Sequence, residues 1–326
     1  MPLLWKTYQM SSNLIRLEKA LFFKMPPFKV LLPTVAMVLM FVVIFSIQPH
    51  TFSYFGLSLL LNLLIPAVFA SIAQMFIITA NDIDLGIGPF ISMINCIAAT
   101  ILTANLFFGI VLLLVSIIAY AAMGALIHIR RLPALVVTLG ASFVWYGFAL
   151  LLLPAPGGGA PKGLVAFVNW SPPFIPLPIL IAILVAGCSY LLLMRSATGA
   201  VLRGMGGNAK AIRQAGWSLL TGRVLLYAAA GICGVIAGLL LTGINTSGDA
   251  NVGTQYTLTS IAAVIVGGSE FSGGDVSPVG AVVGSVVILL TGSMLSFVNI
   301  SASWQLSFQG LILIIVLGLR AFGNKP

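Results

Sequence analysis

Charged side chains are scarce in this chain of 326 residues. Asp, Glu, Lys and Arg together make up 6% of it, against about 25% in soluble domains. So few charges exclude a soluble globular protein. Hydrophobic residues make up 60%, and the mean hydropathy is +1.15. The composition therefore predicts a polytopic membrane protein.

Cysteine and histidine are also rare, which excludes several kinds of site. Cys96, Cys188 and Cys233 each stand alone in an apolar stretch, so we expect small packing residues and no disulfides or metal ligands. His50 and His128 are assigned to opposite faces of the membrane and cannot share a metal ion. No metal site is predicted.

Nucleotide and nucleic-acid sites are equally unsupported. The segment GGGAPKGL around Lys162 lacks the GK[ST] ending of a phosphate loop, and no strand precedes the glycines at 204–207. The net charge of +9 does not indicate nucleic-acid binding, since the basic residues lie between apolar stretches. The chain is therefore expected to bind no cofactor and no nucleic acid.

Ten apolar stretches are candidates for membrane spans. They are residues 30–47, 58–79, 86–102, 107–127, 132–153, 174–193, 224–241, 261–267, 279–298 and 306–319. We expect an all-α fold of about ten transmembrane helices. The eighth stretch is too short to cross alone, so either it takes in residues from Tyr256 onward or it is part of a broken helix.

The charge pattern predicts the orientation of these spans. With the N-terminus in the cytoplasm, alternation puts every Lys and Arg except Lys162 on the cytoplasmic side. Both termini are then cytoplasmic. Residues 1–29 form a basic leader, either an amphipathic helix on the inner leaflet or a loosely ordered segment. Residues 30–322 are expected to form a single transmembrane domain, whose first span is long enough to remain as an anchor.

The longest polar interruption, 195–223, carries five Lys and Arg residues and contains a short helix signal. Asn208 is a favourable N-cap, Ala209 and the following residues suit a helix, and Gly216 can end it. One face carries Ala211, Ile212 and Ala215. The segment is either a docking helix for a cytoplasmic partner or a basic loop with one turn of helix.

Few polar residues interrupt the spans, and those that do have two interpretations. Asp82 and Asp84 either close the cytoplasmic mouth or cap the third span; capping is favoured for Asp84. Glu270 has the same alternatives, with Asp275 expected to cap the ninth span. No acid is expected in mid-membrane, which argues against a proton-driven pump.

Two amides and two aromatic residues have open roles as well. Asn62 and Asn95 either line a translocation pathway or bind a neighbouring helix. Trp145 and Tyr146 either face the pathway or serve in packing and interfacial anchoring, with packing favoured.

Glycine pairs at GxxxG spacing predict close helix packing. The pairs are Gly234 with Gly238 in the seventh span and Gly280 with Gly284 in the ninth. Small residues at this spacing let two helix backbones approach closely.

Three segments resemble one family, the permeases of bacterial ABC importers for ribose and related sugars. They are AVLRGMGGNAKAIRQAGW, YTLTSIAAVIVGGSEFSGGDVSPVGAVVGSVV and NDIDLGIGPFISM. The resemblance covers about residues 58 to 322. It implies a type II importer fold, a dimer of permeases, a periplasmic binding protein, and a separate cytoplasmic ATPase that binds ATP and Mg²⁺. In this family a short cytoplasmic helix sits in a groove of the ATPase, and Asn208 to Gly216 match it.

The sequence departs from the family in several places. The family usually has GGIDLS where this chain has residues 81–86, and GG-T-S-L-x-GG where it has residues 267–274. The family's docking helix usually carries acidic or Ala pairs followed by R-L-S-G-I, where this chain has Lys210 and residues 213–217. Such divergence is typical of permeases that pair with a different chain. A heterodimer of two permeases is therefore one alternative, and a homodimer is the other.

The resemblance implies a permease subunit of the bacterial inner membrane, without enzymatic activity, that moves a monosaccharide or a related small polar solute. The alternatives are another solute of the same family, such as a nucleoside or an autoinducer-like polyol, and an ATP-independent facilitator. An intramembrane enzyme has no candidate site.

Overall fold

The computed structural model describes residues 28–301 together with 304, 307, 310, 311 and 314. Its regular elements are all helical, apart from one isolated bridge between Gly157 and Gly248. In chain order they are α2 (Phe28–Ile47), η1 (Pro49–Phe52), α3 (Tyr54–Leu60), α4 (Leu64–Thr79), α5 (Ile87–Ile97), η2 (Ala98–Leu102), α6 (Leu106–Arg130), α7 (Ala134–Leu152), α8 (Lys162–Val168), α9 (Leu177–Tyr190), η3 (Leu191–Arg195), α10 (Ala197–Gly207), α11 (Ala209–Gln214), α12 (Leu219–Asn245), α13 (Gln255–Val266) and α14 (Pro278–Phe297). The predicted all-α class is confirmed for this part of the chain.

The described helices support six or seven membrane spans. Six are long and apolar enough: α2, α6, α7, α9 with η3, α12 and α14. A seventh forms if α3 and α4, bent by 45° at their junction, cross as one broken span. α5 with η2 and α13 are apolar but shorter. The expected total of ten is not confirmed, and the tenth stretch lies mostly outside the described residues, as does most of the leader.

Several predicted boundaries changed for identifiable reasons. α13 begins at Gln255, so the eighth stretch does extend back past Tyr256. α14 begins at Pro278 and is capped by Ser277, whose side chain accepts a hydrogen bond from the Gly280 amide. The expectation that Asp275 caps this helix is therefore wrong. Helix α8, a short helix in the loop that follows α7, was not predicted.

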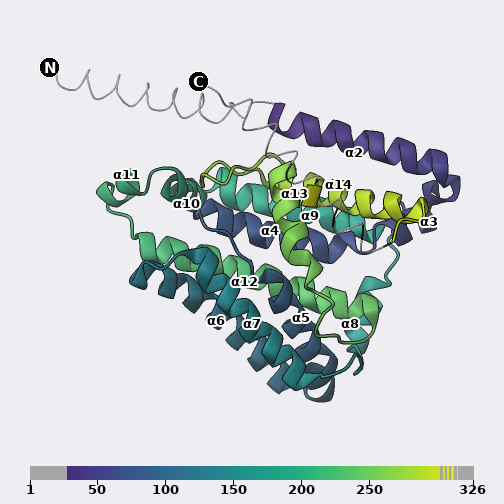
Figure 1. Ribbon diagram of the computed structural model, residues 1–326, viewed down its shortest axis with the longest axis horizontal. Helices are drawn as coiled ribbons and strands as arrows, with labels where there is room; N and C mark the ends of the chain where they lie inside the picture. The colour runs from purple at the N-terminus through teal and green to yellow at the C-terminus, as the bar shows by residue number, and fades with distance from the viewer. Residues whose placement is uncertain (1–27, 302–303, 305–306, 308–309, 312–313, 315–326) are drawn as a thin grey trace.

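The long helices pack side by side in the order α2, α14, α4, α12 and α6 (Figure 1). α5 lies between α7 and α12, and α13 packs on α14 and α4. Only 11% of the α2 span is buried, against 56% for α12 and for α14. The outer helices thus offer apolar surface to lipid, while α4, α12 and α14 form the interior. Cys188 is exposed on α9, so its predicted packing role is wrong, whereas Cys96 is buried.

Both glycine pairs lie where helices approach most closely. A Cβ on Gly234 or Gly238 would meet Phe90 or Ile94 of α5 at 2.7 and 2.6 Å. A Cβ on Gly280 or Gly284 would fall within 2 Å of a carbonyl oxygen of Gly267 or Ala263. Real Cβ atoms do not approach so closely, so these four positions leave no room for a larger side chain.

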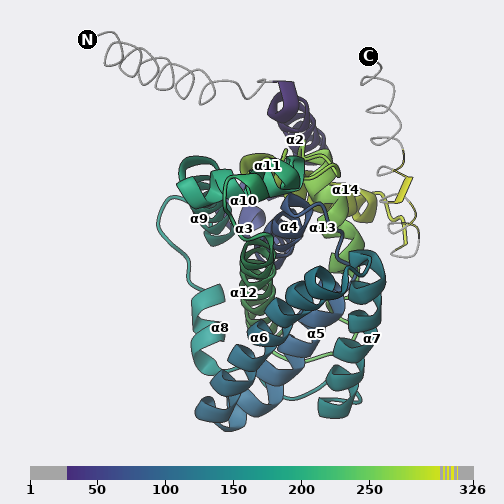
Figure 2. The ribbon, with the colours of Figure 1, turned by 90° about the vertical axis from the view of Figure 1, so that its left-hand side faces the viewer.

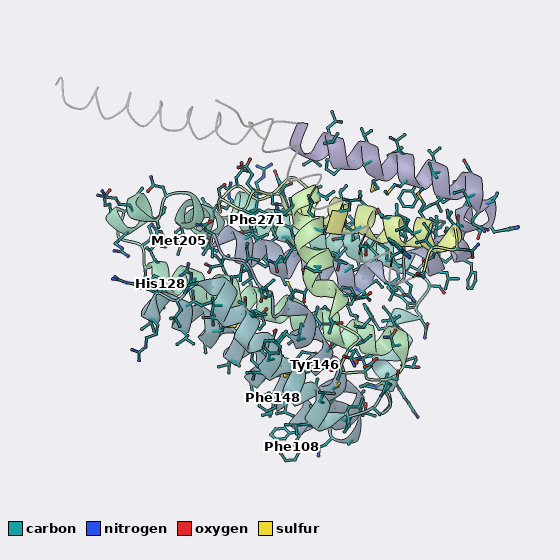
Figure 3. All side chains as sticks on the ribbon, viewed as in Figure 1. Phe108, His128, Tyr146, Phe148, Met205 and Phe271 are labelled. Atoms are coloured by element: carbon teal, nitrogen blue, oxygen red, sulfur yellow. The ribbon has the colours of Figure 1, made fainter. Side chains whose placement is uncertain are left out.

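Helices α10 and α11 lie at one end of the bundle and α3 and α8 at the other (Figures 1 and 2). These are called the α11 end and the α8 end below. Met205 and His128 lie toward the α11 end, while Phe108 lies far from it (Figure 3). Arg131, Arg213 and Arg223 line one cleft at the α11 end, and Lys162 begins α8. Basic residues from distant segments therefore gather at the end that the charge pattern assigns to the cytoplasm.

Candidate functional site

The short helix expected near residue 210 is present as α11. The Asn208 side chain accepts a hydrogen bond of 3.0 Å from the Ala211 amide, as an N-cap does. Gly216 follows with a φ of +85°, and the Trp217 amide donates to the Ile212 carbonyl, which closes the C-terminus. The predicted cap and stop are confirmed, while a partner for this helix remains a proposal.

The predicted face of α11 is corrected at one position. Ala209, Ala211 and Ala215 are exposed, but Ile212 is half-buried. A Cβ on Gly204 of α10 would lie 2.7 Å from Ile212 Cδ1, so the isoleucine side chain packs back onto α10. Ile212 thus anchors α11 to the bundle, and the alanines are left for an external surface.

Glycines allow three segments to meet beneath α10. A Cβ on Gly206 would lie 2.1 Å from the Thr79 carbonyl oxygen and 2.5 Å from the Gly274 nitrogen. The Gly274 amide donates to that same Thr79 oxygen at 3.3 Å, and Gly273 lies against Asn81. The end of α10, the 80–86 loop and the 267–277 loop therefore form one tight junction. Sequence reasoning found these glycines but assigned them no role.

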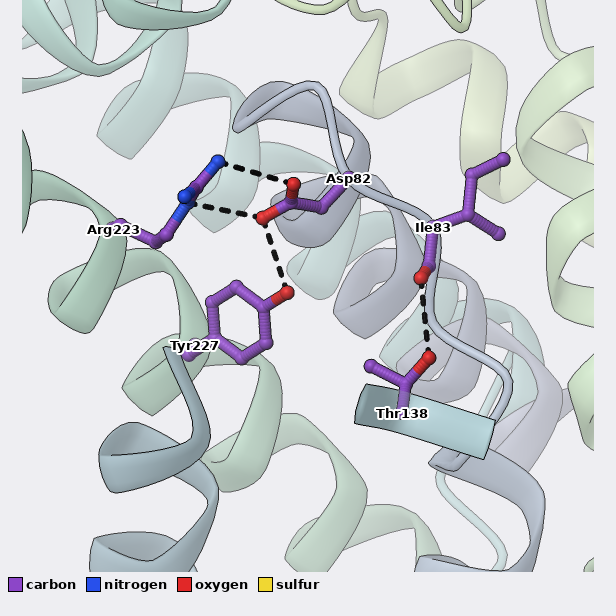
Figure 4. A network of polar contacts seen from close by, with 5 residues as sticks. All are labelled: Asp82, Ile83, Thr138, Arg223 and Tyr227. Carbon is purple, nitrogen blue, oxygen red and sulfur yellow. Dashed lines mark hydrogen bonds and ion pairs between the residues drawn. The ribbon is translucent and has the colours of Figure 1, made fainter. Parts of the chain in front are cut away.

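Arg223 in the first turns of α12 binds Asp82 in the 80–86 loop (Figure 4). Arg223 Nε and Nη2 lie 3.1 Å from Asp82 Oδ2 and Oδ1, and the Tyr227 hydroxyl donates to Oδ2 at 3.1 Å. Asp82 is only 8% exposed. Burial raises the pKa of Asp82, and the Arg223 charge and the Tyr227 hydrogen bond act in the opposite direction.

Asp84 is more deeply buried than Asp82, and no Lys or Arg side chain is among its described hydrogen-bond partners. One carboxylate oxygen accepts from the Gly86 amide at 2.6 Å, and the other accepts from the Tyr120 hydroxyl of α6. The N-cap residue of α5 is Gly86, and Asp84 bonds the amide of this residue ahead of the helix, so the favoured capping role is wrong. Burial raises the pKa of Asp84 to about 6, against the opposing effect of these two hydrogen bonds. Asp84 is nevertheless fully buried, because tertiary packing encloses this loop at the end of α4.

Two residues that sequence reasoning missed hold the 80–86 loop in place. Thr138 of α7 accepts from the Leu85 amide at 3.1 Å and donates to the Ile83 carbonyl at 3.3 Å (Figure 4). The Gln74 amide, in the orientation that satisfies both of its ends, bonds the backbone N and O of Asp84 at 3.2 Å. Gln74 is fully buried. The sequence did contain a signal for both residues, since Gln74 and Thr138 are polar side chains within apolar stretches.

A basic cleft of about 480 Å³ opens beside this loop at the α11 end. Its lining includes His128, Arg131, Arg213 and Arg223. Arg131 ends α6 in the left-handed conformation, with a φ of 53°. Only Arg223 in this set binds an acid in the contacts described, so the cleft offers positive charge to an external group.

The other predicted pathway residues are dispersed. Asn62 lies at the break between α3 and α4. Asn95 is fully buried and donates to Thr242 Oγ1 at 2.8 Å and to the Ser247 carbonyl at 3.2 Å, while its oxygen accepts from the Asp249 amide at 2.8 Å. Asn95 therefore ties α5 to the end of α12, which favours the helix-binding interpretation.

Glu270 lies in the 267–277 loop, where its amide donates to the Asp275 carbonyl and its carboxylate accepts from Ser272. Trp145 packs against Phe90 and Tyr120 with ring centroids 5.6 and 6.4 Å apart. Packing is thus its observed role, as expected. No three His, Cys, Asp or Glu side chains of the described residues lie close enough together to hold a metal ion.

These features define an integral membrane protein whose helices are tied together at one end by a buried carboxylate network. A family model for the permease component of branched-chain amino acid transport systems matches residues 56–317. The chain therefore belongs to this permease family, and it is a transport subunit.

Curated relatives agree with this assignment. The ribose import permease protein RbsC of Haemophilus influenzae is 25% identical over 301 residues, covering 89% of this chain and 93% of the relative. The galactose/methyl galactoside import permease protein MglC of Escherichia coli K12 is 25% identical over 311 residues, covering 87% and 91%. The galactofuranose transporter permease protein YtfT of the same strain is 29% identical over 245 residues, covering 73% and 72%. No solved structure matches the chain.

Proposed function

We propose that this chain is the membrane subunit of an ATP-driven importer for a monosaccharide. The names of its relatives, which specify ribose, galactose and galactofuranose, support the substrate class. The family supports a separate ATPase, which binds ATP and Mg²⁺, together with a periplasmic binding protein and a second permease chain, identical or different. In this proposal the α11 end, with its basic cleft, faces the cytoplasm, and the N- and C-termini are cytoplasmic as the charge pattern predicts.

The observation that carries the proposal is the exposed helix α11 and its mechanical connection to the 80–86 loop. Residues 215–217 connect α11 to Ser218, whose side chain caps α12 by accepting a hydrogen bond from the Thr221 amide. One turn later Arg223 holds Asp82. A displacement of α11 by the ATPase is thus transmitted by a rigid helix start to the buried loop between α4 and α5.

The surface around α11 specifies the partner's groove. Ala211 and Ala215 offer small apolar contacts, and Lys210 and Arg213 are exposed beside them. With Arg131 in the adjoining cleft, this surface is complementary to an acidic groove. We expect assembly with the ATPase to weaken as salt is raised, because exposed charges are screened.

In the proposed cycle, the two ATPase subunits close on ATP and draw the α11 helices of the two permeases together. The 80–86 loops follow through Arg223, and the α8 end opens to receive solute from the binding protein. Hydrolysis reverses the movement and opens the pathway at the α11 end.

The test is uptake by proteoliposomes that contain the permease, its ATPase and its binding protein. Ala211→Asp and Ala215→Asp are expected to abolish solute-stimulated ATP hydrolysis, because each places a carboxylate in an acidic groove. Ala197→Asp is the matched control, since Ala197 is exposed in the first turn of α10, where an acid is tolerated. Solute uptake by the permease alone would contradict the proposal and support a facilitator.

A further inference from the structure

The basic cleft at the α11 end is formed where three segments of the chain meet. Its lining includes residues at and just after the end of α6, one residue of α11 and one of α12: His128, Ile129, Arg131, Leu132, Arg213 and Arg223. His128 lies at the edge of the bundle (Figure 3). The three arginines are close enough for their charges to act on His128. Four basic side chains therefore share one volume of about 480 Å³.

These like charges are only partly neutralised by the protein. Among the described residues, Asp82 is the one acid that bonds a member of this set, and it bonds Arg223. Three arginines against one aspartate leave two positive charges, and His128 can add a third. Like charges that face one another across a cleft repel, and an anion between them removes the repulsion. The cleft therefore favours a ligand that carries negative charge.

Arg131 is held in a conformation that is costly for any residue other than glycine. It follows the last turn of α6 with a φ of 53°, and the next amide, that of Leu132, donates to the Ile127 carbonyl at 3.2 Å. Glycine is the usual residue at this position of a helix end. Strained residues of this kind cluster at ligand clamps and switches. Here the unfavourable backbone brings a guanidinium group to the cleft.

The cleft also has an apolar wall that continues onto the surface of the bundle. Ile129 and Leu132 line the cleft and are exposed. Leu135 and Val136, in the first turn of α7, are exposed as well. α6 is a candidate span that ends at Arg130, so this wall lies where a span leaves the bilayer. A ligand that satisfies the whole cleft is anionic at one end and apolar at the other.

We propose that the cleft binds the phosphodiester headgroup of one anionic phospholipid from the leaflet at the α11 end. Arg131 and Arg213 contact the phosphate, whose oxygens match the planar guanidinium group, and the acyl chains run along Ile129 and Leu132. Basic pockets between transmembrane helices bind such headgroups.

The lipid and the ATPase use different residues. The lining of the cleft does not include Lys210, Ala211 or Ala215, so these side chains of α11 remain available to the ATPase. The inference requires a bilayer and no ATPase, and it therefore stands or falls independently of the proposed function.

The test is lipid binding to the purified full-length permease in a neutral detergent, counted by native mass spectrometry. Dioleoyl phosphatidylglycerol is the anionic probe. Dioleoyl phosphatidylcholine has the same chains without net charge, and glycerol 1-phosphate is the anion without chains. We expect one saturable site for phosphatidylglycerol, with an affinity about 25-fold higher than for phosphatidylcholine, since two arginines contribute about fivefold each. The difference should shrink as salt is raised.

Arg131→Gln and Arg213→Gln should each weaken phosphatidylglycerol binding about fivefold. Arg130→Gln is the matched control, because Arg130 is exposed and adjoins Arg131 but does not line the cleft. Each of these variants changes an exposed side chain, so the melting temperature without lipid should be the same in all of them. Added phosphatidylglycerol should raise the melting temperature of the wild type and of Arg130→Gln more than that of Arg131→Gln.

Equal affinity for the two lipids would overturn the inference. An equal loss of binding in Arg130→Gln would also overturn it, because the lipid would then be held by a diffuse basic surface. Displacement of phosphatidylglycerol by an equal concentration of glycerol 1-phosphate would identify a site for free phosphate compounds instead. Release of the bound lipid when the ATPase is added would assign the cleft to the ATPase, whereas retention of the lipid in the assembled complex supports the inference.

Discussion

Arg223 and Asp82 are 141 positions apart in the chain and meet through two contacts of 3.1 Å, Nε with Oδ2 and Nη2 with Oδ1. This bidentate geometry matches the planar guanidinium group and restrains both side chains. Because Asp82 is nearly buried and Arg223 is about a quarter exposed, the pair is intermediate between a surface and a buried ion pair.

We expect Asp82→Asn and Arg223→Gln each to destabilise the permease by about 1–2 kcal/mol, a value discounted for the exposure of Arg223. Each should also reduce solute-stimulated ATP hydrolysis, since the link from α12 to the 80–86 loop is cut. Thermal unfolding in detergent and ATPase assays of the complex measure the two effects. In the double variant the losses should not add. Additive losses would mean that Asp82 and Arg223 are not coupled. Lys162→Gln at the α8 end is the control variant, and it should change neither stability nor ATP hydrolysis.

Substitution by asparagine should be tolerated at Asp84, unlike at Asp82. Asn can accept from the Gly86 amide and donate to the Tyr120 oxygen, so Asp84→Asn is expected to fold well, whereas Asp84→Leu is not. The raised pKa of Asp84 means that the folded protein favours the protonated carboxyl. The resulting contribution of Asp84 to the free energy of unfolding is complete below the ordinary pKa of 3.8 and is lost as pH rises through the folded-state pKa of about 6.

The free energy of unfolding of the wild type should therefore fall relative to that of Asp84→Asn by on the order of 2 kcal/mol as pH is raised from about 4 to about 7, and the melting temperature should fall with it. Comparing the two proteins at each pH cancels the titration of other groups. A difference that is flat across this range would show that Asp84 titrates as an exposed acid does.

Gly284 and Gly140 provide a matched pair of helical glycines. A Cβ at Gly284 would lie 1.9 Å from the Ala263 carbonyl oxygen, whereas nothing lies within 4 Å of one at Gly140. Gly284→Ala should push α14 away from α13 and cost about 1–3 kcal/mol or more. Gly140→Ala should be neutral or stabilising by up to about 1 kcal/mol, from helix propensity alone. Equal melting temperatures for the two variants would contradict the close approach.

The Asn208 cap should matter for coupling more than for overall stability. Asn208→Ala removes the hydrogen bond to the Ala211 amide, at a cost of about 1 kcal/mol to a helix of six residues that has little stability of its own. We expect faster hydrogen exchange across 209–214 and several-fold weaker ATPase stimulation, both restored in Asn208→Ser. Unchanged exchange with full stimulation in Asn208→Ala would show that packing of Ile212 alone holds α11.

Features that depend on neighbouring residues were predictable. Hydropathy located the apolar helices, and the Asn208 and Gly216 signals located α11, because spans and caps are set within a few residues of each other. The GxxxG pairs were also predictable as packing surfaces, although their partners α5 and α13 were not.

Tertiary structure alone decided which distant residues meet. The pairing of Asp82 with Arg223, the burial of Asp84 against Tyr120, and the three bonds of Asn95 all join segments far apart in the chain. Apolar sequence fixes how a segment enters a membrane, but helix-to-helix contacts are chosen by side-chain shape and hydrogen bonding, which a one-dimensional pattern does not contain.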